Sequence, residues 1–214
     1  MSFQANPKLK LWYTPIACSF APHALLLEAG LDFQMIPLEL GKYTAEFMTL
    51  NPKGRVPVLA MDDEVITEMP AILTAISSLV PERQLMGRTT LETIRAYEWI
   101  NYLSGTLHGQ GYGARFRPDR YIHDPALHPQ VRQRGLETIK ECFAFIESKL
   151  REAGTAYLVG DGFTAVDPFL FVLYRWGVQE KLDMHSDYPY LEAWANRLLE
   201  RKCVVDALKV HNKV

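Results

Sequence analysis

A single cysteine stands where a strand is expected to end and a helix to begin. Cys18 follows the break at Thr14-Pro15 and precedes a run of helix-forming residues. A helix N-terminus favours anions, so a thiol placed there can have a lowered pKa and react as a thiolate. Position 21 is alanine, which excludes the dithiol chemistry of a C-x-x-C pair. Cys18 is therefore predicted to be a monothiol, and the structural alternative is a small buried hydrophobe.

Three other side chains could carry chemistry of their own. Ser19 offers a neighbouring hydroxyl, and capping of the following helix is an equally good explanation for it. Glu68 offers a carboxylate at the start of an expected helix. His108 is a lone histidine, a type that is more often structural, so its assignment depends on context.

Composition narrows the class of protein. Of 214 residues, 48% are hydrophobic and 22% charged, as in an ordinary globular chain. The net charge of -2 gives no attraction to nucleic acid or anionic lipid, and no apolar run approaches the roughly 20 residues that cross a bilayer. The first ten residues lack the apolar core of a signal peptide. Three widely spaced cysteines form neither a disulfide framework nor a zinc pattern, so we expect no metal and a cytoplasmic location.

The first 80 residues predict an α+β domain. Strand patterns occupy 8–13, 33–38, 58–61 and 64–67, and helix patterns occupy 22–29, 44–50 and 68–79. Gly30 is expected to end the first helix. Two strands joined through a helix should be parallel, whereas the last two, joined by Asp62-Asp63, should form an antiparallel hairpin. The order β-α-β-α-β-β-α therefore gives a mixed four-stranded sheet.

Strand signals vanish after residue 80. The polar stretch 81–87 is expected to be a linker. Apolar residues recur at helical spacing in 136–150, and 168–177 is almost entirely apolar, which predicts a buried helix. Segments 188–200 and 203–210 predict two more helices. We therefore assign 1–80 to the first domain and 88–214 to an all-α domain.

Several stretches resemble the glutathione S-transferase family, and most closely its bacterial beta class. Residues 13–23 are similar to the opening of the beta-class enzymes, where a cysteine precedes a helix. Residues 51–57 (NPKGRVP), 67–72 (TEMPAI) and 163–167 (FTAVD) resemble three further family elements, and 99–109 carries Asn101 and His108 at the beta-class separation. The resemblance implies a thioredoxin-like N-terminal domain, an all-α C-terminal domain and a homodimer.

The resemblance also implies a glutathione site in the N-terminal domain. Val56 would offer its main-chain N–H and C=O to the cysteinyl part of the tripeptide, and the bond before Pro57 would be cis. Glu68 would bind the α-ammonium, and the N–H of Met69 the α-carboxylate. Related proteins have serine at this last position, and the missing hydroxyl removes a hydrogen bond worth about 1.5–3 kcal/mol.

Other roles follow from the same resemblance. Cys18, helped by Ser19 and His108, would be the catalytic group. Tyr112 and Trp176 would line the second-substrate pocket, with core packing at least as good an explanation for Trp176. The glutathione-binding set is Tyr13, Lys42, Arg55, Val56, Pro57, Glu68 and Met69. Within it, core packing is favoured for Tyr13, and a solvated surface position is an equal alternative for Lys42.

Three remaining stretches have simpler predictions. The glycine-rich run 109–113 is expected to bend the helix or end it early. The basic and aromatic stretch 115–121 could receive an acidic substrate or a partner, although a solvated loop between helices is favoured. Thr164 and Asp167 form a Thr-x-x-Asp capping box with a structural role.

The leading hypothesis is a glutathione-dependent transferase. It would activate the thiol of glutathione for conjugation to an electrophile or for exchange with a disulfide substrate. A non-catalytic binding or interaction module is the rival, favoured by Met69 and by Gly109, where related proteins often have lysine. A carrier of hydrophobic ligands is a third possibility. Neither nucleic acid nor membrane is expected as a partner.

Overall fold

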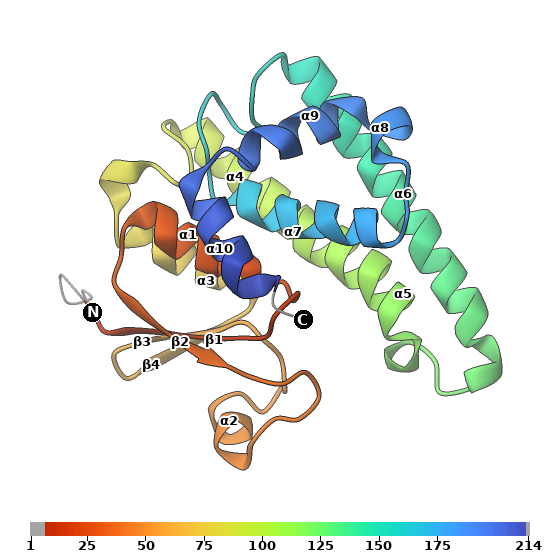
Figure 1. The fold of residues 1–214 in the computed structure, drawn as a ribbon, viewed down its shortest axis with the longest axis horizontal. Coiled ribbons are helices and arrows are strands. Elements are labelled where there is room, and N and C mark those ends of the chain that lie inside the picture. The colour runs from red at the N-terminus through yellow and green to blue at the C-terminus, as the bar shows by residue number, and fades with distance from the viewer. Residues whose placement is uncertain (1–6, 213–214) are drawn as a thin grey trace.

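The computed structural model describes residues 7–212, which form a four-stranded sheet and a larger group of helices (Figure 1). The strands are β1 (Leu9–Tyr13), β2 (Phe33–Pro37), β3 (Val58–Met61) and β4 (Glu64–Thr67). Their order in the sheet is β2-β1-β3-β4. β1 runs parallel to β2 and antiparallel to β3, which pairs with β4 as a hairpin. The predicted mixed sheet is confirmed.

Three helices belong to this first part of the chain: α1 (Phe20–Ala29), α2 (Ala45–Leu50) and α3 (Met69–Ser78). α1 and α3 pack together over one face of the sheet, and α2 projects from the other side (Figure 1). α1 begins two residues earlier than predicted, because Pro22 is accommodated in its first turn. Gly30 ends the helix as predicted, at φ +69°, with its N–H bonded to the carbonyls of Leu26 and Leu27.

The rest of the chain is helical. Its helices are α4 (Thr90–Tyr102), η2 (Leu103–Gly113), α5 (Ala114–Phe116), α6 (His128–Ala153), α7 (Val166–Gln179), α8 (Met184–Asp187), α9 (Pro189–Leu198) and α10 (Lys202–His211). Short 3₁₀ turns are η1 (Pro81–Arg83), η3 (Pro118–Arg120) and η4 (Pro125–Leu127). No helix within residues 7–212 has the length and apolarity needed to cross a membrane.

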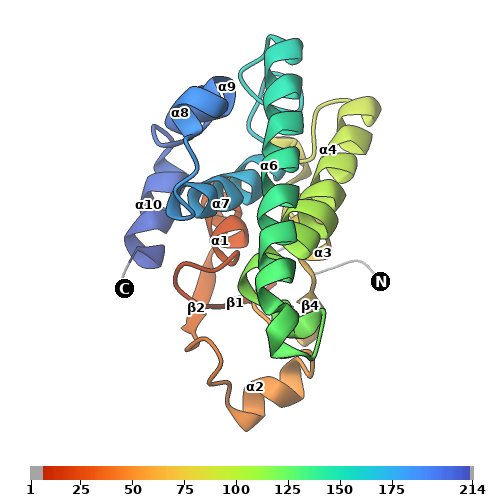
Figure 2. The ribbon, with the colours of Figure 1, turned by 90° about the vertical axis from the view of Figure 1, so that its right-hand side faces the viewer.

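Of the two outcomes predicted for the glycine-rich run, an early end of the helix is wrong, and a bend stays a prediction. α4 continues into η2, a π-helix, and then into α5. The glycines instead permit close packing against α6, which runs beside η2 (Figure 2). A Cβ on Gly135 of α6 would lie 2.6 Å from the nitrogen of Arg115 and 2.8 Å from the carbonyl oxygen of Gly111. Since real Cβ atoms do not approach backbone so closely, a side chain here would force the two helices apart.

At the start of α7, the carboxylate of Asp167 makes the predicted capping interaction with Thr164. Asp167 is fully buried, and its Oδ2 accepts hydrogen bonds from the N–H of Thr164 at 2.7 Å and from the hydroxyl of the same residue at 3.1 Å. Its Oδ1 accepts from Nε1 of Trp194 at 3.1 Å, which ties α7 to α9. Burial raises the pKa of Asp167 to about 6, although these hydrogen bonds and the charge of Arg201 favour the ionised form.

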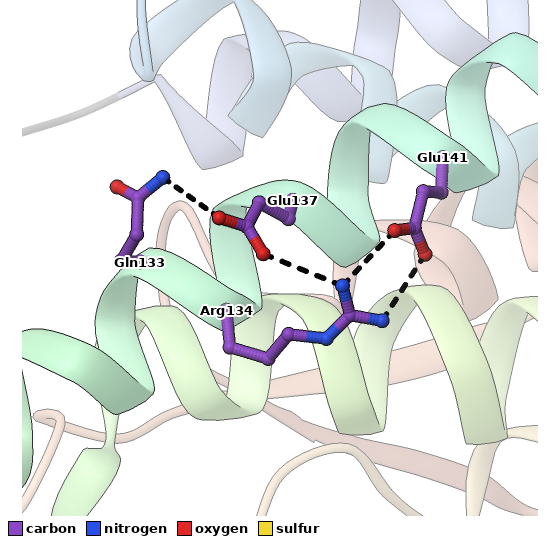
Figure 3. A network of polar contacts seen from close by, with 4 residues as sticks. All are labelled: Gln133, Arg134, Glu137 and Glu141. Atoms are coloured by element: carbon purple, nitrogen blue, oxygen red, sulfur yellow. Dashed lines mark hydrogen bonds and ion pairs between the residues drawn. The ribbon is translucent and has the colours of Figure 1, made fainter.

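The surface of α6 changes character along its length. In its first half, Arg134 bonds Glu137 and Glu141, and Gln133 also donates to Glu137 (Figure 3). These side chains are exposed, so this half presents a charged, solvated face. Phe145, nearer the C-terminal end, is 43% exposed.

α1 is enclosed by the sheet on one side and by α7 and α10 on the other. His23 of α1 and His211 of α10 meet there, with ring centroids 5.4 Å apart. Both are buried, and within the described chain Nδ1 of His23 and both ring nitrogens of His211 have no hydrogen-bond partner. Burial lowers the pKa of His23 to about 4, and lowers that of His211 to about 3 with help from the positive charge of Arg175. Both rings are neutral at pH 7.

We expect the contribution of this pair to the free energy of unfolding to fall as the pH drops from about 6.5 to about 4. In that window the unfolded histidines bind protons that the buried ones do not. A shift the size of that of His23 corresponds to a loss on the order of 3 kcal/mol. Asp167 acts in the opposite sense, because its raised pKa makes the folded state bind its proton first.

Comparing wild type with His211→Phe separates the effect of the buried histidines from that of Asp167. Urea unfolding at pH 7 and pH 4.5 should show a smaller acid loss in the variant, with the exposed His123→Gln as the control that behaves like wild type. Equal acid losses in wild type and His211→Phe would contradict the neutral, buried state of this ring.

Candidate active site

The loop between β1 and α1 places Cys18 against the loop before β3. Its thiol, 7% exposed, donates a hydrogen bond to the carbonyl oxygen of Val56 at 3.6 Å. The Val56–Pro57 peptide bond is cis, as predicted. No hydrogen bond within residues 7–212 engages the N–H of Val56. Two of the residues singled out in the sequence, 38 positions apart, are thus in contact.

The predicted lowering of the Cys18 pKa is wrong. Burial raises the pKa of this thiol to about 12, and the backbone N–H groups of Cys18 and Ser19 offset only part of the rise. The stabilisation of an anion by the helix N-terminus is present but smaller than the desolvation penalty. Cys18 therefore carries its proton at neutral pH and acts as a hydrogen-bond donor.

Ser19 does not take the catalytic role predicted for it. It is fully buried, and its Oγ donates to the carbonyl of Thr14 at 3.1 Å and accepts from the N–H of the same residue at 3.2 Å. Its side chain makes no capping hydrogen bond to α1. Because both its donor and its acceptor capacity are engaged, Ser19 closes the turn that carries Cys18.

Ile16 is a functional position that the sequence did not reveal. It has φ +58°, a left-handed conformation that is costly for a β-branched residue, on the order of 1–3 kcal/mol. Its N–H donates to the carbonyl of His211 at 3.2 Å, and its own carbonyl accepts from Nε1 of Trp176 at 2.9 Å. Two helices of the C-terminal part therefore hold the loop that carries Cys18.

Glu68 has a strained backbone at the start of α3, with φ +73°. Its carboxylate pairs with Nζ of Lys53 at 2.5 Å, and the same ammonium donates to the hydroxyl of Thr67 at 2.6 Å. The side chain of Met69 is buried in the core, so only its main chain belongs to the α3 N-terminus. Lys53 was missed because its only signal was its place within the 51–57 stretch.

The remaining N-terminal candidates lie apart from this pair. Lys42 forms an exposed ion pair with Glu39 at 2.6 Å. The ring of Tyr13 packs against His211, with centroids 5.4 Å apart, in line with the core packing favoured for it. The carbonyl of Arg55 accepts from Asn51 at 2.8 Å, while its guanidinium is exposed.

His108 lies in η2 and packs against Trp176, with ring centroids 5.5 Å apart. Burial lowers the pKa of His108 to about 4, the positive charges of Arg55 and Arg120 lower it further, and the carboxylate of Glu68 opposes them. Charges of the N-terminal half, those of Arg55 and Glu68, therefore act on this imidazole. It is neutral at pH 7.

Tyr112 cannot line a second-substrate pocket as predicted. It is 1% exposed, and its hydroxyl donates to the carbonyl of Leu173 at 2.7 Å. Its ring lies behind Trp176, with centroids 5.1 Å apart. Trp176 itself is partly exposed and bridges η2, α5 and the Cys18 loop.

The described part of the chain shows no metal-ligand cluster and no disulfide bond. Residues 7–212 contain no group of three or more His, Cys, Asp or Glu side chains arranged to hold a metal ion. Cys18, Cys142 and Cys203 are free and buried. The site instead combines a protonated thiol, an unengaged main-chain N–H, a carboxylate–ammonium pair and a neutral imidazole.

Comparisons with known proteins agree with this geometry. Residues 7–78 match the glutathione S-transferase N-terminal domain, and residues 120–202 match the C-terminal domain. The chain is 33% identical to glutathione S-transferase GstA of Escherichia coli O157:H7, over 94% of this chain and 97% of that protein.

Solved structures give the same result. A beta-class glutathione S-transferase of Sphingomonas chungbukensis is 30% identical, with a TM-score of 0.84, over 96% of this chain and all of the other. A sphingomonad glutathione S-transferase complexed with glutathione is 31% identical, with a TM-score of 0.83 and the same coverage. Together with the family domains, these relatives show that the chain belongs to the glutathione S-transferase family.

Proposed function

We propose that this protein binds glutathione on the N-terminal half and activates its thiol for transfer to an electrophile. The observation that carries the proposal is the main chain of Val56, which among residues 7–212 is unengaged at its N–H and bonded at its carbonyl only to the thiol of Cys18. A strand-like ligand can pair with such a main chain as it would with a sheet edge. Residues 1–80 would hold glutathione, 81–87 would be the linker, and 88–214 would contribute the second-substrate pocket.

Glutathione binding would change the hydrogen-bond partner of the Cys18 thiol. When the cysteinyl N–H of glutathione takes the carbonyl of Val56, the thiol of Cys18 is released and can donate to the glutathione sulfur. A hydrogen bond to the charged form of a group favours that form, so the donor lowers the pKa of the bound thiol. The raised pKa of Cys18 suits it to this role and leaves little thiolate for attack on a disulfide.

Binding of the γ-glutamyl end would exchange ion pairs. Glu68 already holds Lys53, so the ligand's α-ammonium must take its place. Both side chains are about half exposed, and exposed pairs contribute only about 0–1 kcal/mol, so the exchange costs little. The released ammonium of Lys53 can then bind the α-carboxylate, which compensates for the hydroxyl that Met69 lacks.

Two substitutions, one on each side of the ion pair, test this exchange. Glu68→Gln should weaken glutathione binding about tenfold to a hundredfold, because a hydrogen bond to a charged group is worth about 1.5–3 kcal/mol. Lys53→Met should also weaken binding if Lys53 holds the α-carboxylate. Calorimetric titration with glutathione measures both.

Lys202→Met, which removes an exposed lysine of α10, is the matched control and should bind like wild type. Tighter binding by Lys53→Met would mean that Lys53 only competes with the ligand for Glu68. Absence of binding by the wild type at high millimolar glutathione would favour a non-catalytic interaction module instead.

Cys18→Ala separates conjugation from disulfide exchange. We expect conjugation to survive with about a twofold to tenfold lower kcat/KM, the effect of losing one modest hydrogen bond. The pH profile of kcat/KM should move to higher pH, and Cys18→Ser, which keeps a donor, should move it less. Complete loss of activity, with a mixed disulfide on wild-type Cys18 detected by mass spectrometry, would assign the protein to exchange chemistry.

We further propose a homodimer formed through α4 and α6. Trp99, Tyr102 and Phe145 line a groove of about 590 Å³ between these helices, and Leu91 and Ile94 beside it are 62% and 57% exposed. The groove also carries both charge signs. Two-fold symmetry places a patch against its own copy, so a patch with both signs is self-complementary.

Sedimentation equilibrium tests the dimer. Wild type should sediment at twice the 24.4 kDa chain mass, and Ile94→Glu should shift it towards the monomer by placing a charge in the apolar contact. Leu199→Glu, at an exposed apolar position after α9, is the control. A monomeric wild type would refute the proposal.

We place this activity in the cytoplasm, on the support of three free cysteines.

A further inference from the structure

The basic stretch 115–121 divides into a structural part and an unpaired part. Arg115 is anchored, because its Nε bonds Glu180 at 2.6 Å with both side chains largely buried, and its carbonyl accepts from Arg132 at 2.7 Å. Arg117 and Arg120 are exposed and have no carboxylate partner among the described residues. Within residues 7–212 the one side-chain hydrogen bond of Arg117 is a long one, 3.4 Å, to the carbonyl of the preceding Phe116. Two guanidinium groups therefore remain available to a ligand.

Packing fixes this segment close to the reactive loop. Phe116, next to Arg117, contacts Trp176 with ring centroids 6.0 Å apart. Trp176 contacts His108 and donates to the carbonyl of Ile16, two residues before Cys18. The hydroxyl of Tyr121 donates to the carbonyl of Gly109, which holds the far end of the segment against η2. Phe116 and Trp176 thus connect the segment that carries the two arginines to the loop that carries the thiol.

The charges of this segment act on two other groups, Tyr43 and His108. Burial and the nearby thiol of Cys18 raise the pKa of Tyr43, and Arg117 and Arg120 act against that rise. Arg120, together with Arg55, also lowers the pKa of His108.

The acidic groups nearby do not balance these arginines. Glu68 is already paired with Lys53. Within the 115–121 segment, Asp119 carries the single carboxylate. Arg55, Arg117 and Arg120 thus give the site a net positive field. Guanidinium groups bind carboxylates through paired, parallel hydrogen bonds.

We propose that the second substrate is an electrophile that carries a carboxylate, and that Arg117 and Arg120 bind this carboxylate. The inference rests on the proposed transferase function and specifies its substrate class. Phe116 and Trp176 suit an aromatic or apolar body for the same molecule. Arg117 and Arg120 act as specificity residues, because they touch the substrate but not the reacting atoms.

Two matched electrophiles test the proposal: chlorodinitrobenzene, which is neutral, and chlorodinitrobenzoate, which adds a carboxylate. In both, the glutathione sulfur forms the new C–S bond, the C–Cl bond breaks, chloride leaves with the bonding electrons, and the thiol proton passes to solvent. Wild type should favour the benzoate, and this preference should fall with added salt.

The variants Arg117→Gln, Arg120→Gln and the double variant identify the cause. The double variant should lose about tenfold or more in kcat/KM for the benzoate and little for the neutral compound. Its KM for glutathione should not change. Arg134→Gln removes an exposed arginine from α6 (Figure 3) and should leave both substrates unaffected.

Three results would overturn the proposal. Equal losses on both electrophiles would mean that the arginines are structural. A raised KM for glutathione without a change in preference would mean that they bind the tripeptide itself. An unchanged preference in the double variant would remove them from recognition altogether.

Failure of the proposed function would look different. If wild type binds glutathione but conjugates neither compound, the transferase assignment fails. The preformed glutathione conjugates of the two compounds then decide the inference by calorimetry. Tighter binding of the carboxylated conjugate, lost in the double variant, would still support it, and equal binding of the two would refute it.

Discussion

Enclosure of α1 on both sides is the constraint on which the rest of this structure depends. The sheet covers one side of the helix, and α7 and α10 cover the other, so its residues are almost all buried. The loop that leads into α1 is consequently held by both halves of the chain. Ser19 closes it from within, and Ile16 is bonded to α10 and α7. The position of Cys18 is therefore a property of the whole fold and not of its loop alone.

The same enclosure decides the chemistry of the thiol. A helix N-terminus stabilises a nearby charge by about 0.3–1 kcal/mol, and up to about 2 kcal/mol in favourable geometry. Full burial can move a pKa by up to roughly 3–5 units in the opposite direction, and each unit is worth about 1.4 kcal/mol. At Cys18 burial wins. A site that depended on a free thiolate would need a more open loop, whereas a thiol that donates to another sulfur can remain enclosed.

Local patterns predicted what depends on neighbouring residues in the chain. Alternation and turn chemistry placed all four strands, and Gly30 marked the end of α1, because each signal lies within a few residues. The glycines of 109–113 gave an incomplete prediction for the same reason: Gly111 lies against Ile139 of α6, more than twenty residues away in the chain. Ser19, Lys53 and Tyr112 depend on contacts that spacing cannot reveal. A serine looks the same in sequence whether its hydroxyl faces a ligand or, as here, a carbonyl of its own loop.

Net charge was likewise a poor guide to the site. The chain carries a formal charge of -2, yet the groups around Cys18 include three arginines without carboxylate partners. Cationic and anionic ligands therefore meet different conditions in this site. A cation must displace Lys53 from Glu68, whereas an anion can bind Arg117 or Arg120 without breaking an existing pair. Selectivity for charge in this site follows from which side chains are already paired: Glu68 is held by Lys53 from the loop before β3, whereas Arg117 and Arg120, beside and within η3, are exposed.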